Sequence, residues 1–274
     1  MKNLIILLIF FSFNCKAQLN SYYSQLTNAN NPITVLFFGE SNSGGKGEND
    51  SLTVTELSPR NINIFNNFTR IIEPLDVGTN NLLYHAGFTP NLYHGIENGI
   101  ANLYDNDSTR SNNITLIKCG QGGTKYYNWT IADSLWATTN SWDSLVKRTN
   151  ETKLLLDYNW NNKNFFVFFS FGINDAFTDT TIFRQGVETM IANLHNHLGF
   201  IPQWYVTRID FYEAALGGNP GQDYSLQRLA AKYNFFNLIE TNDLTFVDAA
   251  HWDFKGLKNI SRRMVNQINT YLTQ

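Results

Sequence analysis

The chain has 274 residues, of which 43% are hydrophobic and 16% are charged, and its formal net charge is −3. The 20 Lys and Arg side chains do not outnumber the 23 Asp and Glu, which excludes the basic excess typical of proteins that bind nucleic acid or anionic membranes. The 21 Phe, 13 Tyr and 6 Trp exclude intrinsic disorder, and two cysteines exclude a disulfide framework.

Residues 1–17 have the pattern of a secretory signal peptide. A positive start precedes an apolar run over 4–13, and the small residues Cys15 and Ala17 form a cleavage site. The run is too short to span a bilayer stably. We therefore expect a secreted or periplasmic protein with one domain over 18–274. A lipid anchor on Cys15 and a buried N-terminal strand are the alternatives.

Short apolar runs alternate with helical patterns along the rest of the chain. In chain order, the expected elements are strand 33–38, strand 62–65, helix 91–104, strand 114–119, helix 141–158, strand 165–169, helix 182–198, strand 204–207, helix 224–233, strand 235–239 and helix 254–272. Strands that are apolar on both faces and separated by helices indicate a parallel sheet covered on both sides. The sequence therefore predicts an α/β fold: a three-layer α/β/α sandwich with a central, mostly parallel sheet.

Ligands of such sheets bind beyond the carboxyl ends of the strands. Polar, glycine-rich segments stand at these places: GESN at 39–42, GQGGT at 120–124 and GIND at 172–175. A fourth segment, DAAH at 248–251, precedes the last helix. We expect these four segments to meet at one edge of the sheet.

The four segments supply every group that a serine hydrolase needs: a hydroxyl nucleophile, a base, a residue that orients the base, and donors for the oxyanion. Ser41 is the candidate nucleophile and His251 the candidate base, with Asp248 three residues before it. Gly123 offers a main-chain N–H and Asn174 an amide. Each residue alone has a structural explanation as a helix cap, turn former or core histidine. Together they favour acyl transfer, with Gly122 and Asp253 left as alternatives to Gly123 and Asp248.

In this order, the segments resemble the SGNH (GDSL-like) hydrolase superfamily. GESNSGG at 39–45 is most similar to the first block of the sialate O-acetylesterase and acetylxylan-esterase-like carbohydrate esterases, and GGT at 122–124 with Trp129 resembles their second block. The resemblance implies a flavodoxin-like fold, with Ser41 as nucleophile, His251 as general base and Asp248 as orienter. It also implies an oxyanion hole made by the N–H of Ser41, the N–H of Gly123 and the Asn174 amide, with no metal and no organic cofactor.

The sequence departs at two places from the branch of carbohydrate esterases that it resembles. Glu40 replaces the usual Gln or Asp, and GIND stands at 172–175 where the branch often carries a GExD-like variant. We expect neither change to touch a catalytic atom.

The implied activity is removal of O-acetyl groups from oligo- or polysaccharides or sialic acids, with no nucleic-acid partner and no implied protein partner. Activity is expected to rise through roughly pH 6–7, where histidine ordinarily titrates. Crowding by Phe38 and by other aromatics predicts acetyl over longer acyl groups. The aromatics expected to stack on sugar rings are Tyr126, Tyr127, Trp129 and Trp252.

Other functions remain open at this point. An SGNH lipase or acyl esterase would act on non-carbohydrate esters, and a non-catalytic module would use the aromatics to bind glycans. A glycosidase would use Glu40 and Asp175 as its carboxylate pair. His195 and His197 do not suggest a metal site, because side chains two apart on a helix diverge by about 200°.

Overall fold

The computed structural model describes residues 32–48, 51–52, 62–80, 93–105, 114–130, 141–209, 220–248 and 250–274. The expected signal peptide over 1–17, including Cys15, lies outside these residues, as do residues 91–92 of the first expected helix. Among the described residues, no helix combines the length and the apolar character needed to cross a bilayer.

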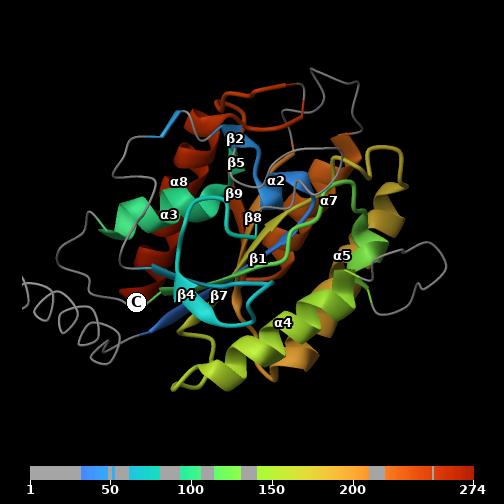
Figure 1. Ribbon diagram of the computed structural model, residues 1–274. Coiled ribbons are helices and arrows are strands. Elements are labelled where there is room, and N and C mark those ends of the chain that lie inside the picture. The colour runs from blue at the N-terminus through green and yellow to red at the C-terminus, as the bar shows by residue number, and fades with distance from the viewer. Residues whose placement is uncertain are drawn as a thin grey trace, which may run out of the picture.

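A seven-stranded sheet forms the middle layer of the molecule (Figure 1). Its order is β4-β3-β6-β1-β7-β8-β9, and every neighbouring pair is parallel except β3 with β4. The central strand β1 pairs with β6 on one side and β7 on the other, so the chain winds outward from it in both directions. The strands are β1 (Ile33–Gly39), β3 (Ile62–Phe65), β4 (Ile72–Pro74), β6 (Ile114–Lys118), β7 (Phe165–Ser170), β8 (Gln203–Thr207) and β9 (Phe236–Ile239).

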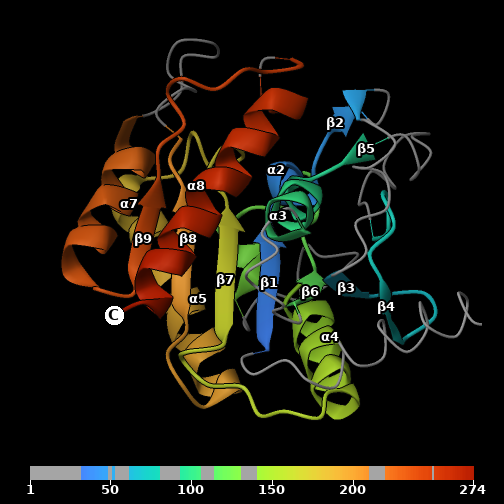
Figure 2. The same cartoon turned by 90° about the vertical axis from the view of Figure 1, so that its left-hand side faces the viewer.

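Helices cover both faces of this sheet, as Figure 2 shows. On one face lie α3 (Ile96–Asp105) and α8 (Phe254–Leu272), and on the other α4 (Ser141–Leu155), α5 (Thr180–Leu198) and α7 (Pro220–Lys232). A 3-10 turn, η3 (Tyr126–Trp129), joins the second group. The expected three-layer α/β/α sandwich is therefore confirmed.

The apolar strands are buried on both faces because alternate side chains enter different layers. In β7, Phe165 and Phe169 lie in the core under α4, α5 and α7, whereas Phe166 and Phe168 lie in the core under α3 and α8. All four are fully buried. The run FFVFF therefore serves two cores, which is why it shows no polar alternation.

Several element bounds differ from the expected ones. The helix expected from residue 91 begins at Ile96, and residues 93–94 form the two-residue strand β5 (Tyr93–His94), paired with β2 (Gly47–Glu48). The helix expected from residue 224 begins at Pro220, a residue favoured in the first helical turn because it needs no N–H partner there. Strands of two or three residues, such as β2, β4 and β5, carry too little pattern to be expected from sequence.

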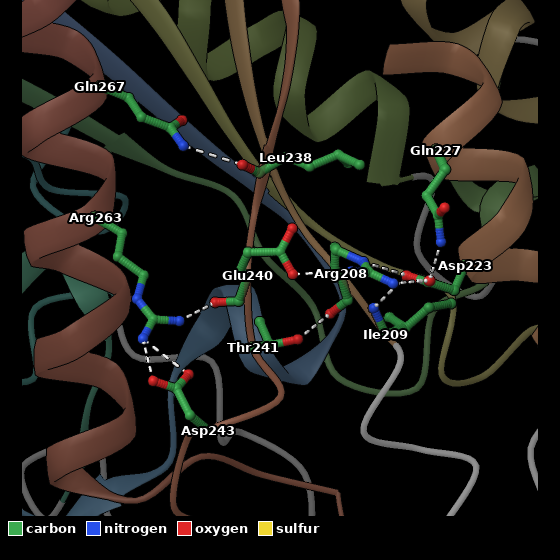
Figure 3. Close-up of polar contacts among 10 residues, drawn as sticks. All are labelled: Arg208, Ile209, Asp223, Gln227, Leu238, Glu240, Thr241, Asp243, Arg263 and Gln267. Carbon is green, nitrogen blue, oxygen red and sulfur yellow. Dashed lines mark hydrogen bonds and ion pairs between the residues drawn. The ribbon is translucent and has the colours of Figure 1, made fainter. Parts of the chain in front are cut away.

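Side-chain bonds tie the carboxyl ends of β8 and β9 to the neighbouring helices (Figure 3). Arg208, directly after β8, donates to Asp223 of α7 through Nη2 at 2.6 Å and Nε at 3.2 Å, and to Glu240 after β9 at 2.8 Å. Arg263 of α8 bonds Asp243. These bonds fix the sheet edge from which the loops of the candidate site emerge.

Candidate active site

Ser41 stands at the start of the short helix α2 (Ser41–Gly44), directly beyond the central strand β1. The sharp turn into α2 passes through Gly39, whose φ is +124° and whose added Cβ would lie 2.2 Å from the carbonyl oxygen of Ser170. Only glycine fits this conformation and this close approach. Ser43 then fixes α2 to the sheet, donating to the Phe38 carbonyl at 2.7 Å and accepting the Ser170 N–H at 3.1 Å.

The structure brings the three residues expected to form the triad together. Ser41 Oγ lies 2.9 Å from His251 Nε2, although the two residues are 210 positions apart. On the other side of the ring, His251 Nδ1 lies 2.8 Å from Asp248 Oδ1 and 2.9 Å from Oδ2. This is the hydroxyl–imidazole–carboxylate chain that activates a nucleophile.

Asp248 is held by main-chain and side-chain donors. Its Oδ1 accepts the N–H groups of Ala250 and His251, each at 2.9 Å, and its Oδ2 accepts from Lys46 Nζ at 2.6 Å. Partial burial opposes ionisation, but the hydrogen bonds from Lys46, Ala250 and His251 outweigh it and hold the pKa of Asp248 well below its usual range. Asp248 is therefore an ionised carboxylate at neutral pH.

The alternative orienter, Asp253, is used elsewhere. Its Oδ1 caps α8 by accepting the Gly256 N–H at 2.8 Å, and it also accepts from the Thr245 hydroxyl at 2.6 Å. Of the two aspartates, it is therefore Asp248 that contacts the His251 ring.

Asn42 joins the turn that carries Ser41 to the loop that carries His251, a contact that the sequence pattern does not predict. Its Nδ2 donates to the Ala250 carbonyl at 2.9 Å, and its Oδ1 accepts the Trp252 N–H at 3.4 Å. These bonds fall on the residues on either side of His251. The signal available in the sequence was the position of Asn42 directly after Ser41.

Main-chain donors stand open beside Ser41. Within the described part of the chain, the N–H groups of Ser41, Gly122 and Gly123 form no hydrogen bond. A Cβ added to Gly122 would lie 3.9 Å from Ser41 Cβ, and Gly123 adopts a φ of +74° with open space around it. Both glycines therefore stay candidates for the oxyanion donor.

Asn174 is placed differently from the expectation. Its Nδ2 donates to Glu40 Oε2 at 2.7 Å and to the Thr124 carbonyl at 3.1 Å. Because a side-chain amide carries two N–H donors, these bonds use both of them. Asn174 reaches the site edge as expected, but in this state its amide presents no spare donor to an oxyanion.

Glu40 touches Asn174, which corrects the expectation that this replacement contacts no catalytic group. The side chain is completely buried and accepts the N–H groups of Ile173 and Asn174, each at 3.2 Å, as well as the Asn174 amide. Burial raises the pKa of Glu40 to about 8, against the opposing effect of the bonds from Asn174 and Ile173.

Asp175 is also buried, with the Tyr126 N–H bonded to Oδ2 at 3.2 Å and the Thr178 hydroxyl to Oδ1 at 3.3 Å. Burial raises its pKa to about 6. Glu40 and Asp175 are therefore both enclosed rather than facing a cleft, which argues against the glycosidase alternative.

Two of the four expected sugar platforms are core residues. Trp129 is 0% exposed and packs on Phe38, and Trp252 is 1% exposed in the core under α8. The expectation that they stack on substrate is wrong, because both side chains are enclosed in the protein core. Tyr126 and Tyr127 are half-buried and form an edge-to-face pair at 5.6 Å.

The loop that carries Asn174 presents an aromatic residue that the sequence analysis did not single out. Phe177, three residues after Asn174, is 98% exposed. A single phenylalanine does not indicate by itself that its side chain is exposed. The signal available in the sequence was its position shortly after a strand, at the edge of the sheet where the site lies.

The two histidines on α5 are accounted for by local contacts. His195 Nε2 accepts from the Trp204 indole at 3.3 Å, and His197 Nε2 lies 2.8 Å from the Thr149 hydroxyl. Over the described ranges, His, Cys, Asp and Glu side chains form no cluster of three suited to a metal ion.

Comparisons with known proteins agree with this geometry. The family model described as "Carbohydrate esterase, sialic acid-specific acetylesterase" matches residues 33–270. Among solved structures, a protein from Arabidopsis thaliana superposes with a TM-score of 0.68 at 17% identity, covering 88% of this chain and 99% of that one. NanS superposes with a TM-score of 0.63 at 14% identity, covering 89% of this chain and 98% of its own. No curated protein matches the chain in sequence.

Proposed function

The chain belongs to the carbohydrate esterase family of sialic acid-specific acetylesterases, and from that premise we propose that it removes O-acetyl groups from carbohydrates by acyl transfer through Ser41. The observation that carries this proposal is the continuous chain of polar contacts from Ser41 Oγ through the His251 ring to Asp248, with distances of 2.9 Å and 2.8 Å.

In the first step, Ser41 Oγ attacks the acetyl carbonyl while His251 Nε2 takes the hydroxyl proton. The Asp248 carboxylate stabilises the imidazolium that forms, and the same imidazolium then protonates the sugar oxygen as it leaves. In the second step, His251 removes a proton from water, which attacks the acetyl-enzyme and releases acetate. The proton returned by His251 restores the Ser41 hydroxyl.

Negative charge develops on the carbonyl oxygen in both steps. The open N–H groups of Ser41 and of Gly122 or Gly123 are suited to bind it, because they are fixed by the turn and the glycine segment before the reaction begins. Main-chain donors of this kind need no rearrangement at the moment of attack.

The substrate we propose is an acetylated oligo- or polysaccharide or an acetylated sialic acid. The family supports the carbohydrate and the acetyl group. The half-buried Tyr126 and Tyr127 and the exposed Phe177 offer aromatic faces near the loops of the site.

We further propose that the enzyme acts outside the cytoplasm, supported by the signal-peptide pattern over 1–17. Mass spectrometry of the protein after expression in a host with a secretion pathway distinguishes an N-terminus at Gln18 from a lipid on Cys15.

The function is tested by acetate release from a panel of acetylated substrates: xylan, pectin, mannan and sialic acids. Ser41→Ala should abolish release and labelling by a serine-reactive phosphonate. Ser51→Ala, at an exposed serine, should leave both unchanged. If Ser41→Ala keeps more than a few per cent of the activity, Ser41 is not the nucleophile. Comparison of p-nitrophenyl acetate, butyrate and octanoate tests the acyl group, and highest efficiency on octanoate would indicate a lipase-like enzyme.

A further inference from the structure

Glu40 is a buried carboxylate one residue before the proposed nucleophile. Its side chain has no exposed surface, and its partners are all N–H donors: the main chain of Ile173 and Asn174 and the Asn174 amide. Within the described ranges, no Lys, Arg or His side chain bonds to it. A buried acid without a cation is costly to keep ionised, so its protonation state is sensitive to pH.

The bond from Asn174 Nδ2 to Glu40 Oε2 is, at 2.7 Å, the shortest of the three that Glu40 accepts. A bond to an ionised carboxylate is about twice as strong as a neutral one. While Glu40 is ionised, the amide proton nearest to it is therefore firmly held, and the second proton is bonded to the Thr124 carbonyl at 3.1 Å. Asn174 then has no free side-chain N–H to donate to the substrate.

We propose that Glu40 is a positioning residue whose charge decides whether the Asn174 amide can donate to the oxyanion of the reaction. The inference rests on the proposed acyl-transfer function. With Glu40 protonated, its oxygens are weak, neutral acceptors, and Asn174 Nδ2 is free to turn one N–H toward the oxyanion. With Glu40 ionised, the N–H is captured, and a second negative charge stands near the one that develops on the substrate. Both effects slow the reaction.

The surroundings of Glu40 set the pH at which this happens. Burial is the main cause that raises its pKa to about 8, and the negative charge of Asp175 adds to it. The residues of α2 and β7 that contact Glu40 carry no charge. Beyond these, Lys125 acts on Asp175, and His251 bonds Ser41, the residue after Glu40. The protonated, active form of Glu40 therefore prevails at neutral pH and is lost as the pH rises through about 8.

The test compares the pH profiles of kcat and KM for acetate release in wild type, Glu40→Gln and Glu40→Ala. Wild-type kcat should fall above about pH 8, with little change in KM. Glu40→Gln has the same shape but cannot ionise, so its kcat should stay level to pH 9.5. Glu40→Ala leaves the main-chain N–H groups of Ile173 and Asn174 without their acceptor and the Asn174 loop unfixed, so kcat should fall at every pH, by about 10- to 100-fold.

Asp175→Asn is the matched control, because it removes the neighbouring charge and keeps Glu40. The fall in kcat should persist in this variant but move to lower pH, since the Asp175 charge raises the pKa of Glu40. In parallel, infrared difference spectra between about pH 7.5 and 10, a range above the pKa of about 6 of Asp175, should show the loss of a protonated carboxyl band in wild type. That band should be absent from Glu40→Gln.

A folded Glu40→Gln variant that keeps the wild-type fall in kcat would overturn the inference. If Glu40→Ala does not fold, as judged by circular dichroism, the profile of Glu40→Gln and the infrared band decide the question without it. Failure of the proposed function itself gives a different result: Ser41→Ala would remain active, whatever the behaviour of the Glu40 variants.

Discussion

Replacing Asp248 by Asn separates the charge of this residue from its shape. Two main-chain N–H groups, of Ala250 and His251, point at Oδ1 from 2.9 Å and cannot turn away. Oδ2 lies 2.9 Å from His251 Nδ1 and accepts from Lys46, a long side chain that is 21% exposed and can move into solvent. Asn is therefore expected to place its oxygen at the Oδ1 position and its NH₂ toward Lys46. His251 keeps a proton on Nδ1 and an acceptor 2.8 Å away from it.

The loss of activity should then reflect charge alone. Exchanging a charge-assisted hydrogen bond for a neutral one costs about 1–2 kcal/mol. The imidazolium also loses the attraction of a carboxylate about 4 Å away, which is worth about 1 kcal/mol in water and about 4 kcal/mol near a protein surface. Because the Asp248 side chain is 38% exposed, the lower part of that range applies. The total of about 2–4 kcal/mol corresponds to a fall in kcat/KM of about 30- to 10³-fold.

The assay is kcat/KM for acetate release by Asp248→Asn, Asp248→Ala and the double variant Lys46→Met/Asp248→Asn. Loss of the correct tautomer typically costs about 10⁴-fold, and Asp248→Ala should approach that value. The double variant should be at least as active as Asp248→Asn, because no cation then faces the new NH₂. Equal activity of Asp248→Asn and Asp248→Ala would refute the reasoning from the main-chain donors.

Three further outcomes follow from other contacts. Glu97→Leu should lower the free energy of unfolding in urea by about 3–5 kcal/mol, because it leaves the fully buried Lys118, now bonded to Glu97 at 2.7 Å, without a partner. Adding Lys118→Met should restore most of the loss, and a change below about 1 kcal/mol in Glu97→Leu would contradict this. Asn42→Ala should lower kcat about tenfold with KM unchanged, because it removes a hydrogen bond of about 1–2 kcal/mol that holds the histidine loop. A wild-type kcat in this variant would show that the loop does not need this bond. Phe177→Ala should raise KM about 2- to 10-fold on polymeric substrate and leave p-nitrophenyl acetate unaffected, and equal KM values on the polymer would remove Phe177 from the binding surface.

The sequence predicts best what depends on local pattern. The double-faced apolar run of β7 predicts a buried central strand, and the glycine and polar residues at strand ends predict where Ser41 and His251 meet. The strand-end rule works because parallel strands align their carboxyl ends, so residues far apart in sequence share one edge.

What the sequence does not predict depends on contacts between distant segments. The hydrogen bond between Glu40 and Asn174 joins residues 134 positions apart, and the identity of neither residue indicates that they meet. Trp129 and Trp252 were misplaced because an aromatic ring suits a core and a sugar site equally well. The choice of Asp248 over Asp253 required the observation that Asp253 caps α8.

Because Ser43 fixes α2 to the sheet, the position of Ser41 reports on the integrity of the whole fold. A helix of four residues has no stability of its own. Hydrogen bonds from Ser43 to β1 and β7 hold this helix in place. The Thr207 hydroxyl of β8 supports the same region by donating to Ser170 Oγ at 3.0 Å. Central strands are the last parts of a domain to open, so Ser41 should lose its position only when the sheet itself comes apart. Loss of phosphonate labelling during denaturation should accordingly follow global unfolding.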